Sequence, residues 1–111
     1  MRRRNEIEQE EWLLKLQRHV EANIGNGKFT VTDLARLMYC SNRQLRRKLN
    51  EYTGQSPSEY LIEARLQKAH SYLKQKTFPT IVSTALAVGY KDSMHFTQIF
   101  RERFGVLPSE L

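Results

Sequence analysis

Hydrophobic residues along this chain recur at steps of three and four, which is the period of one face of an α-helix. Between about Asn5 and Ile24 the apolar stripe passes through Leu13, Leu16 and Val20. A Gly-Asn-Gly segment follows and predicts the end of this first helix, because both residue types tolerate the left-handed backbone that stops helices. The same period continues to the end of the chain, so the pattern predicts an all-α fold.

Two capping patterns mark the starts of the next two helices. Thr30 with Asp33, and Ser41 with Gln44, each match a capping box, in which two side chains satisfy unpaired backbone N–H groups of the first turn. The helix that Thr30 opens is short, and the helix that Ser41 opens runs to about Tyr52. Helix, tight turn and helix within about twenty residues is the spacing of a helix-turn-helix motif, with the second helix in the recognition position.

A longer helix is predicted after this motif. Ser56 and Pro57 combine a capping residue with proline at the first helical position, and Glu59 completes the capping box. The helix has no internal glycine or proline and is expected to run to about Gln75. The segment Phe78-Pro79 is expected to end it, because proline cannot continue a helix.

The last part of the chain repeats the first motif. Thr80 is expected to cap a short helix to about Val88, and Asp92 to cap a helix from Ser93 to Phe104. The segment GQSPSEY after the first motif is echoed by GVLPSEL after the second, and the two recognition helices align at an offset of 51 positions. Two copies of this kind indicate a duplicated helix-turn-helix unit.

Composition indicates what kind of partner to expect. The 111 residues carry a net charge of +6 with a pI near 9.7, which favours a polyanion such as nucleic acid. The single Cys40 can form no internal disulfide, and no run approaches the ~18 apolar residues of a membrane span, so we expect a cytoplasmic chain without a membrane partner. No metalloprotease, P-loop or nucleophile-elbow motif occurs. The sequence therefore predicts no enzyme, no catalytic residue, no metal ligand and no cofactor.

The recognition helix of the first motif carries its charge on one face. Leu45 and Leu49 stand one turn apart toward the core, and Arg43, Arg46 and Arg47 lie on the opposite side. Such a strip is either a solvated surface or a nucleic-acid contact, and the helix-turn-helix spacing favours the contact. An arginine fork pairs with both O6 and N7 of guanine in the major groove, but arginine also binds phosphates. The pattern leaves open which arginine does which.

Taken together, these motifs resemble the DNA-binding domain of the AraC/XylS family of bacterial transcription regulators. The resemblance covers essentially residues 29–111. It is carried by the S-x-x-x-L-x-R-K-L run from Ser41, the G-x-S-P-x-E-Y-L turn from Gly54, the R-L-x-x-A of the linker helix from Arg65, and the F-x-x-x-F-x-x-x-F-G-x-x-P series that ends at Pro108.

The resemblance implies one domain over residues 1–111 with about seven helices: a first helix-turn-helix subdomain at about 5–54, a linker helix at about 57–75 and a second subdomain at about 78–111. It implies sequence-specific binding of double-stranded DNA by two recognition helices in successive major grooves, regulating bacterial transcription. It also implies RNA polymerase as a partner and a sensing or receiver domain elsewhere in a full-length chain, of which these residues are expected to be a fragment.

Carried over position by position, the resemblance places DNA contacts on both recognition helices. In the second helix, Gln98 can pair with adenine and Met94 can touch a thymine methyl group, while His95 stays open between a DNA contact and a packed or solvated side chain. The candidate contact residues are Asn42, Arg43, Gln44, Arg46, Arg47 and Asn50 in the first helix, and Ser93, Met94, His95, Gln98 and Arg101 in the second.

Three residues depart from the family pattern. Tyr39 stands in the first turn where the family commonly has the glycine that Gly89 keeps in the second turn. A bulky residue is strained at positive φ, so we expect the first turn to be built differently. Thr84 replaces an apolar residue, and Met94 stands where a small polar residue is common, which argues against purely polar readout by the second helix.

One alternative from another class is a basic helical module that binds RNA or an acidic protein. Surfaces that recognise RNA generally expose aromatic rings for stacking. The aromatic residues of this chain, Trp12 among them, are expected to lie on core stripes. The sequence therefore favours duplex DNA over this alternative.

Overall fold

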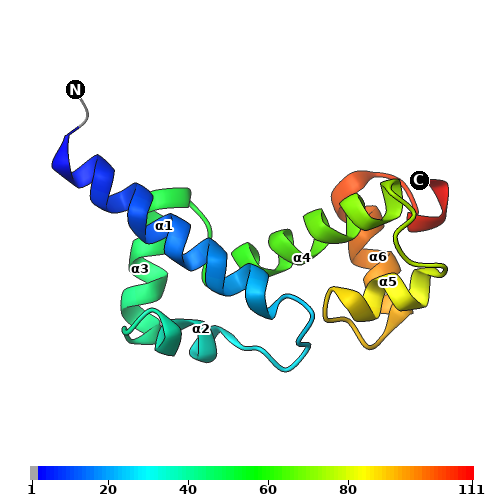
Figure 1. Cartoon of the computed structure of the whole chain (residues 1–111), viewed down its shortest axis with the longest axis horizontal. Coiled ribbons are helices and arrows are strands. Elements are labelled where there is room, and N and C mark those ends of the chain that lie inside the picture. The colour runs from blue at the N-terminus through cyan, green and yellow to red at the C-terminus, as the bar shows by residue number, and fades with distance from the viewer. Residues whose placement is uncertain (1–2) are drawn as a thin grey trace. The chain divides into compact units, whose positions relative to one another are not determined.

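The computed structural model describes residues 3–111, and this range is all-helical with no strand (Figure 1). The all-α prediction is confirmed, and the seventh expected helix is a single 3-10 turn. Residues 1 and 2 of the predicted domain lie outside the described residues. The elements are α1 (Arg4–Asn23), α2 (Val31–Leu37), α3 (Asn42–Thr53), α4 (Pro57–Lys74), α5 (Ile81–Ala87), α6 (Ser93–Phe104) and the 3-10 turn η1 (Pro108–Glu110).

The helices begin where the sequence supplies capping residues. Thr30 Oγ1 accepts the N–H of Asp33 at 3.1 Å, and the N–H of Thr30 donates to Asp33 Oδ2 at 2.9 Å. Ser41 and Gln44 exchange the equivalent pair of bonds at 3.1 and 2.9 Å. Thr80 opens α5 with a capping box of its own. The predicted starts of α2, α3 and α5 are therefore confirmed. They can be predicted from the sequence because each depends on side chains only three residues apart.

By its contacts the chain forms two compact units. The first comprises the residues up to Asn23 together with Phe29–Leu61, and the second comprises Ile24–Lys28 together with Ile62–Leu111. Helix α4 thus contributes its first turn to the first unit and the remainder to the second. The subdomain limits expected from the sequence stay a prediction.

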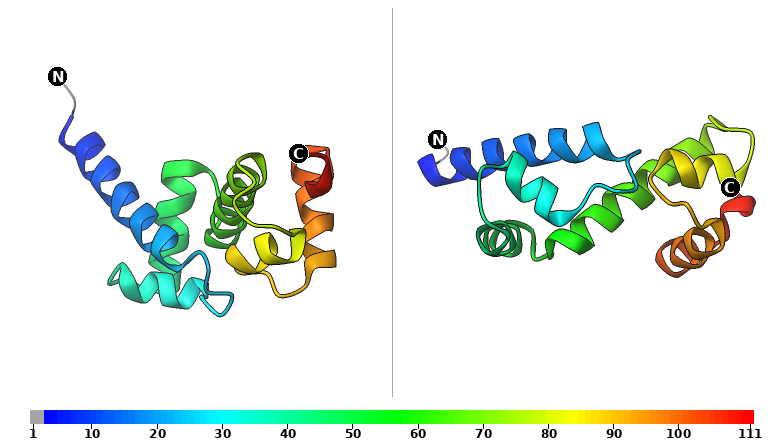
Figure 2. Two further views of the ribbon diagram at one scale, coloured as in Figure 1. Left: turned by 45° about the vertical axis from the view of Figure 1, so that its right-hand side comes forward. Right: turned by 90° about the horizontal axis from the view of Figure 1, so that it is seen from below.

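In the first unit α2 contacts both α1 and α3 (Figure 2). Leu45 and Leu49 are fully buried, so the predicted inward face of α3 is confirmed. The ring of Trp12 meets that of Tyr52 edge-on at a centroid distance of 5.5 Å, so the tryptophan packs between α1 and α3. The other buried side chains of these helices are Leu16 and Val20 of α1 and Leu34 and Ala35 of α2.

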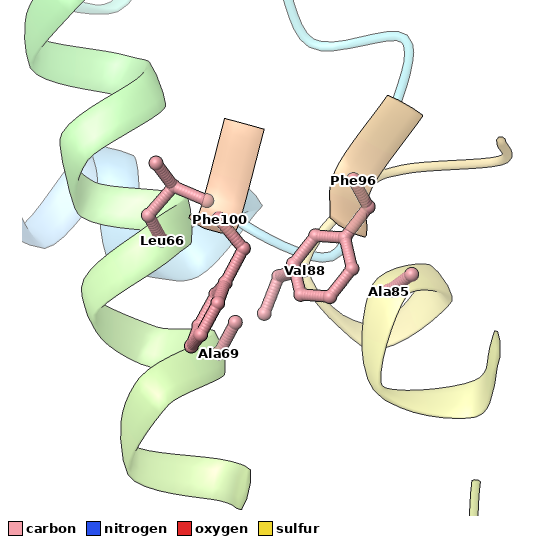
Figure 3. Close-up of a cluster of buried hydrophobic side chains, with 6 residues drawn as sticks. All are labelled: Leu66, Ala69, Ala85, Val88, Phe96 and Phe100. Atoms are coloured by element: carbon pink, nitrogen blue, oxygen red, sulfur yellow. The ribbon is translucent and has the colours of Figure 1, made fainter. Parts of the chain in front are cut away.

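In the second unit α4, α5 and α6 contribute to an apolar core with two phenylalanines, Phe96 and Phe100, at its centre (Figure 3). Their ring centroids lie 5.7 Å apart, and both residues are fully buried. Thr84 is also buried, and its hydroxyl donates to the carbonyl of Thr80 at 2.9 Å. The polar replacement is therefore satisfied within its own helical turn. The remaining buried members of the cluster are Leu66, Ala69, Ala85 and Val88.

The turns of the two motifs are built alike, so the expectation of a different first turn is wrong. Tyr39 has a φ of 56° and Gly89 a φ of 92°, and both lie in the left-handed region. In each turn the N–H of the following residue reaches back into the preceding helix, to the carbonyl of Ala35 at 3.0 Å and of Ala85 at 2.9 Å. These bonds hold the tyrosine in a conformation that costs a non-glycine residue roughly 1–2 kcal/mol.

Helix α4 ends at Lys74, close to the predicted end, but not for the expected reason. Lys76 adopts a φ of 52°. The N–H groups of Lys76 and Thr77 reach back to carbonyl groups of the last turn at 3.2 and 2.9 Å, which are the bonds of a left-handed helix end. The helix is therefore closed before the Phe78-Pro79 segment, which was expected to stop it.

A buried arginine whose role the sequence does not indicate holds several segments of the second unit together. Arg65 is only 7% exposed. Its Nη1 donates to the carbonyl groups of Ile24 and Val88, the latter at 2.8 Å, and its Nη2 donates to the carbonyl of Asn26 at 3.2 Å. A Cβ at Gly89 would lie 1.8 Å from Nη1, so this glycine leaves the space that the guanidinium occupies.

Candidate nucleic-acid interface

Helix α3 turns one face to the core and the other to solvent. The Ser41 cap fixes where the helix starts, and the buried Leu45 and Leu49 fix which side faces inward. The opposite side is therefore the outer surface of the first motif. The structure leaves exposed all the residues proposed for DNA contact on this helix, namely Asn42, Arg43, Gln44, Arg46, Arg47 and Asn50.

A shallow concavity lies on this outer face. Within residues 3–111, none of the three arginines of this face, Arg43, Arg46 and Arg47, has an ion-pair or side-chain hydrogen-bond partner. The lining includes a single carboxylate, that of Glu51. The face therefore offers three guanidinium groups that can bind an external anion or base edge. The lining residues are Arg43, Gln44, Arg46, Arg47, Asn50 and Glu51.

Two of the candidates on α3 also serve the fold. Gln44 Oε1 accepts the N–H of Ser41 in the capping box. Asn42 Nδ2 donates to Thr32 Oγ1 of α2 at 3.0 Å. The first bond closes the start of α3 and the second holds it against α2, so the two amides position the helix in addition to facing outward.

Helix α6 takes the equivalent place in the second motif. Asp92 Oδ1 accepts the N–H groups of Met94 at 3.0 Å and His95 at 3.2 Å, while Phe96 and Phe100 face the core. The imidazole of His95 lies against the ring of Tyr90 at a centroid distance of 6.1 Å. Of the candidates, Met94, His95, Gln98 and Arg101 are exposed, and Ser93 is half-buried.

The outer face of α6 carries a second shallow concavity with the opposite balance of charge. Its lining includes two carboxylates, Asp92 and Glu102, and one guanidinium, Arg101. The amide of Gln98 lies at the limit of hydrogen bonding to Glu102, with Nε2 3.5 Å from Oε1. This surface is therefore much less attractive to an anion than that of α3. The other lining residues are Met94, His95, Thr97 and Leu107.

The other arginine of α6 is not part of this surface. Arg103 Nε donates to both carboxylate oxygens of Glu63 on α4 at 2.9 and 2.8 Å, and Nη2 lies 2.7 Å from Oε1. The hydrogen bonds from Arg103 lower the pKa of the Glu63 carboxyl group. Arg103 is thus committed to an ion pair within the second unit.

Sequence reasoning missed several residues that line the two concavities. Glu51 and Glu102 stand four residues after Arg47 and Gln98, so the helical period alone could have found them. Leu107 follows the left-handed turn at the end of α6, and the tertiary fold places it in the lining of the concavity. No helical period predicts its position.

Residues 3–111 give no support to metal binding, to a reactive thiol or to a membrane span. Residues 3–111 contain no group of three or more His, Cys, Asp or Glu side chains placed to hold a metal ion. Burial raises the pKa of the half-buried Cys40 thiol, which disfavours a reactive thiolate. Among the helices described, none combines the length and the apolar character that a membrane span needs.

The fold and the two exposed faces define a protein with paired helix-turn-helix motifs. A family described as a helix-turn-helix domain matches residues 34–111. The chain is 39% identical over 82 residues to the uncharacterized HTH-type transcriptional regulator YidL of Escherichia coli K12, covering 74% of this chain and 27% of that protein. It is 36% identical over 91 residues to the HTH-type transcriptional regulator ArgR of Pseudomonas aeruginosa, covering 82% and 27%.

A solved structure has the same fold over most of its length. The crystal structure of a transcriptional regulator with an AraC-type DNA-binding domain, from Chromobacterium violaceum, matches with a TM-score of 0.82 and 34% identity, covering 91% of this chain and 88% of that one. The chain belongs to the AraC-type family of helix-turn-helix domains. It spans about a quarter of the length of the curated relatives that it matches, 27% of each.

Proposed function

We propose that this chain binds double-stranded DNA sequence-specifically and regulates transcription, with α3 and α6 as its recognition helices. The observation that carries the proposal is the set of three unpaired guanidinium groups on the outer face of α3. The major groove of B-DNA admits an α-helix and distinguishes all four base pairs. A helix-turn-helix protein with a basic outer face fits that groove in shape and in charge.

The arginines of α3 give this proposal its chemistry. A guanidinium that reaches O6 and N7 of guanine together discriminates against a wrong base by roughly 1–3 kcal/mol. Phosphate contacts fix the register of the helix, and we expect at least one of Arg43, Arg46 and Arg47 to make one. All three protrude from a helix whose start is fixed by the Ser41 capping box, so the backbone is ordered before DNA binds.

The second motif is proposed to read a separate part of the same site. Successive major grooves recur every ~34 Å on one face of the duplex. Helix α4 joins the motifs, and its 18 residues correspond to a length of about 27 Å. We therefore propose a bipartite, non-palindromic site for one chain, with α3 and α6 in successive grooves.

We extend the same proposal to a longer protein that would contain this domain. The relatives named above are transcription regulators of greater length, and their family consists of regulators, not enzymes. We propose a cytoplasmic regulator that works with RNA polymerase and carries a sensing or receiver domain elsewhere in its chain.

The alternative, an RNA- or acidic-protein-binding module, is less well supported. The expectation that all aromatic residues lie on core stripes is wrong for Tyr39, which is 87% exposed in the turn of the first motif. The outer faces of α3 and α6, however, have no Phe, Tyr or Trp ring in their described linings, and the imidazole of His95 lies against the ring of Tyr90. The large rings on which RNA bases usually stack are therefore missing from the described linings of both recognition helices.

A selection experiment tests the proposal. Duplexes that bind are selected from a random library, and their affinity is measured by mobility shift beside scrambled duplex and single-stranded RNA of the same length. We expect a single consensus, bound more tightly than scrambled duplex by roughly a thousandfold or more, which is the lower end of the roughly 10³–10⁷ range of specific recognition. Equal affinity for scrambled duplex, or tighter binding to the RNA, would contradict the proposal.

A further inference from the structure

One large apolar side chain stands on the outer face of α6 with nothing over it. Met94 is 82% exposed and lies in the first turn of the helix, where its own N–H donates to Asp92. It lines the concavity that also contains His95, Gln98 and Arg101. So exposed a side chain adds little to the core, so packing does not account for a methionine at this position.

The internal repeat shows which residue occupies this position in the other motif. At the offset of 51 positions that aligns Leu45 with Phe96, Met94 corresponds to Arg43. The first motif therefore presents a guanidinium where the second presents a thioether. Both side chains are exposed, and both line the concavity of their helix. The two motifs share a backbone design but offer different chemistry to the same part of a groove.

The side chains around Met94 do not favour electrostatic binding of DNA phosphates. In the same alignment Asp92 replaces Ser41 as the capping residue, which adds a carboxylate where the first motif has a neutral hydroxyl. Glu102 adds a second carboxylate to the lining. These groups repel phosphates, so α6 draws less of its affinity from the DNA backbone than α3 does. Contacts to base edges have to supply more of it.

The 5-methyl group of thymine is the apolar feature on a base edge in the major groove. A methionine side chain is flexible, polarizable and apolar, so it can cover a methyl group without a fixed hydrogen-bond geometry. It cannot form the bidentate contacts of arginine, glutamine or asparagine with a purine. An exposed methionine on a recognition helix therefore discriminates through apolar contact.

We propose that Met94 is a specificity-determining residue that contacts the 5-methyl group of a thymine in the part of the site read by α6. The inference rests on the proposed function and names what the second motif recognises. An exposed apolar residue can also be incidental to function. Val82 on α5, which is 52% exposed and lines neither concavity, supplies the matched control.

The test uses the selected duplex. Each thymine is replaced in turn by deoxyuridine, which removes the methyl group and keeps the base pair. The affinity of each duplex is measured for the unchanged chain and for Met94→Ala, Met94→Leu and Val82→Ala. Circular dichroism of each variant checks that its helices are retained.

We expect one replacement to weaken binding of the unchanged chain about fourfold, the equivalent of roughly 0.8 kcal/mol for one buried apolar carbon. In Met94→Ala the same replacement should have no effect. Met94→Leu should keep part of the effect, and Val82→Ala should keep all of it.

Two results would overturn the inference while leaving duplex binding intact. One is that no thymine shows a methyl dependence in the unchanged chain. The other is a methyl dependence of the same size in Met94→Ala. A failure to select any duplex would instead overturn the proposed function, and this inference with it.

Discussion

Gly54 and Gly89 both have a left-handed backbone but differ in what surrounds them. Gly54 ends α3 with a φ of 76°, and a Cβ there would meet nothing within 4 Å. Gly89 has a φ of 92°, and a Cβ there would lie 1.8 Å from Arg65 Nη1 and 2.9 Å from the carbonyl oxygen of Ile24. The first glycine serves its conformation alone, whereas the second also gives Arg65 the room to bind its carbonyl partners.

Alanine at these two positions should separate conformation from space. We expect Gly54→Ala to lower the free energy of unfolding by about 1 kcal/mol, the cost of the left-handed conformation for an alanine. Gly89→Ala should lower it by roughly 3 kcal/mol or more, because it adds an overpacked contact to that cost. Urea denaturation of both variants measures the difference. Equal losses would show that Arg65 does not need the space at Gly89.

Tyr39 stands at the same conformation without the freedom of glycine. Its ring is exposed, and Lys15 Nζ lies 5.3 Å from the ring centroid, a contact worth about 0.5 kcal/mol at an exposed site. The contact with Lys15 therefore offsets only a small part of the backbone strain at this turn.

Paired substitutions measure that strain. Tyr39→Gly should be more stable to urea than Tyr39→Ala by about 1 kcal/mol, because both lose the ring and only glycine accepts the positive φ. Gln67, exposed in the middle of α4, provides the reference position. There the order should reverse, with the alanine variant more stable by about 1 kcal/mol. The same order at both positions would argue against a left-handed Tyr39.

At the scale of the helices, the sequence predicts where a helix starts better than where it ends. It also predicts poorly which tertiary contacts a side chain makes. The starts of α2 and α3 rest on Thr30 and Ser41, whose partners lie three residues away. The end of α4 depends on a left-handed lysine, Lys76, which no residue preference indicates. The role of Arg65 depends on carbonyl groups 23 to 41 residues distant, so it appears only in the folded chain.

The candidate site, too, can be predicted where it depends on residues close together in the sequence and not where it depends on tertiary contacts. The outward face of α3 is predictable because Leu45 and Leu49 fix its inner side through the helical period. The charge of the α6 concavity is harder to predict, since Arg103 turns to Glu63 and leaves Arg101 as the guanidinium of that lining. Periodicity therefore finds the face, and tertiary contacts decide which of its charges are available.

The two faces of α3 should respond differently to substitution. Arg46→Ala or Arg47→Ala should weaken binding of the selected duplex by roughly 1–3 kcal/mol and leave helicity unchanged, because both side chains are exposed. Leu49→Ala should instead cost about 2–5 kcal/mol of stability, because Leu49 is fully buried. Mobility shift and circular dichroism measure the two effects. A loss of helicity in the arginine variants equal to that of the leucine variant would show that the face assignment is wrong.

At the scale of the whole molecule, the net charge of +6 makes salt a sensitive probe. If about six phosphates are neutralised, affinity should fall on the order of a thousandfold between about 50 and 200 mM salt, linearly on logarithmic axes. A variant that loses one phosphate contact should show a slope smaller by about one, whereas a variant that loses only a base contact should keep the slope. Arg43→Ala, Arg46→Ala and Arg47→Ala can be sorted in this way. A flat salt response of the unchanged chain would exclude phosphate binding.

The central claim is that both motifs of one chain bind the same duplex. It is tested most directly by inserting five base pairs between the two parts of the selected site and measuring affinity and footprint. Half a helical turn moves the second groove to the far side of the duplex, and a continuous α4 of 18 residues cannot follow it. We predict that affinity falls to that of a duplex carrying one part alone, that protection of the second part is lost, and that a ten-base-pair insertion does not restore either. Unchanged affinity with an unchanged footprint would contradict the claim.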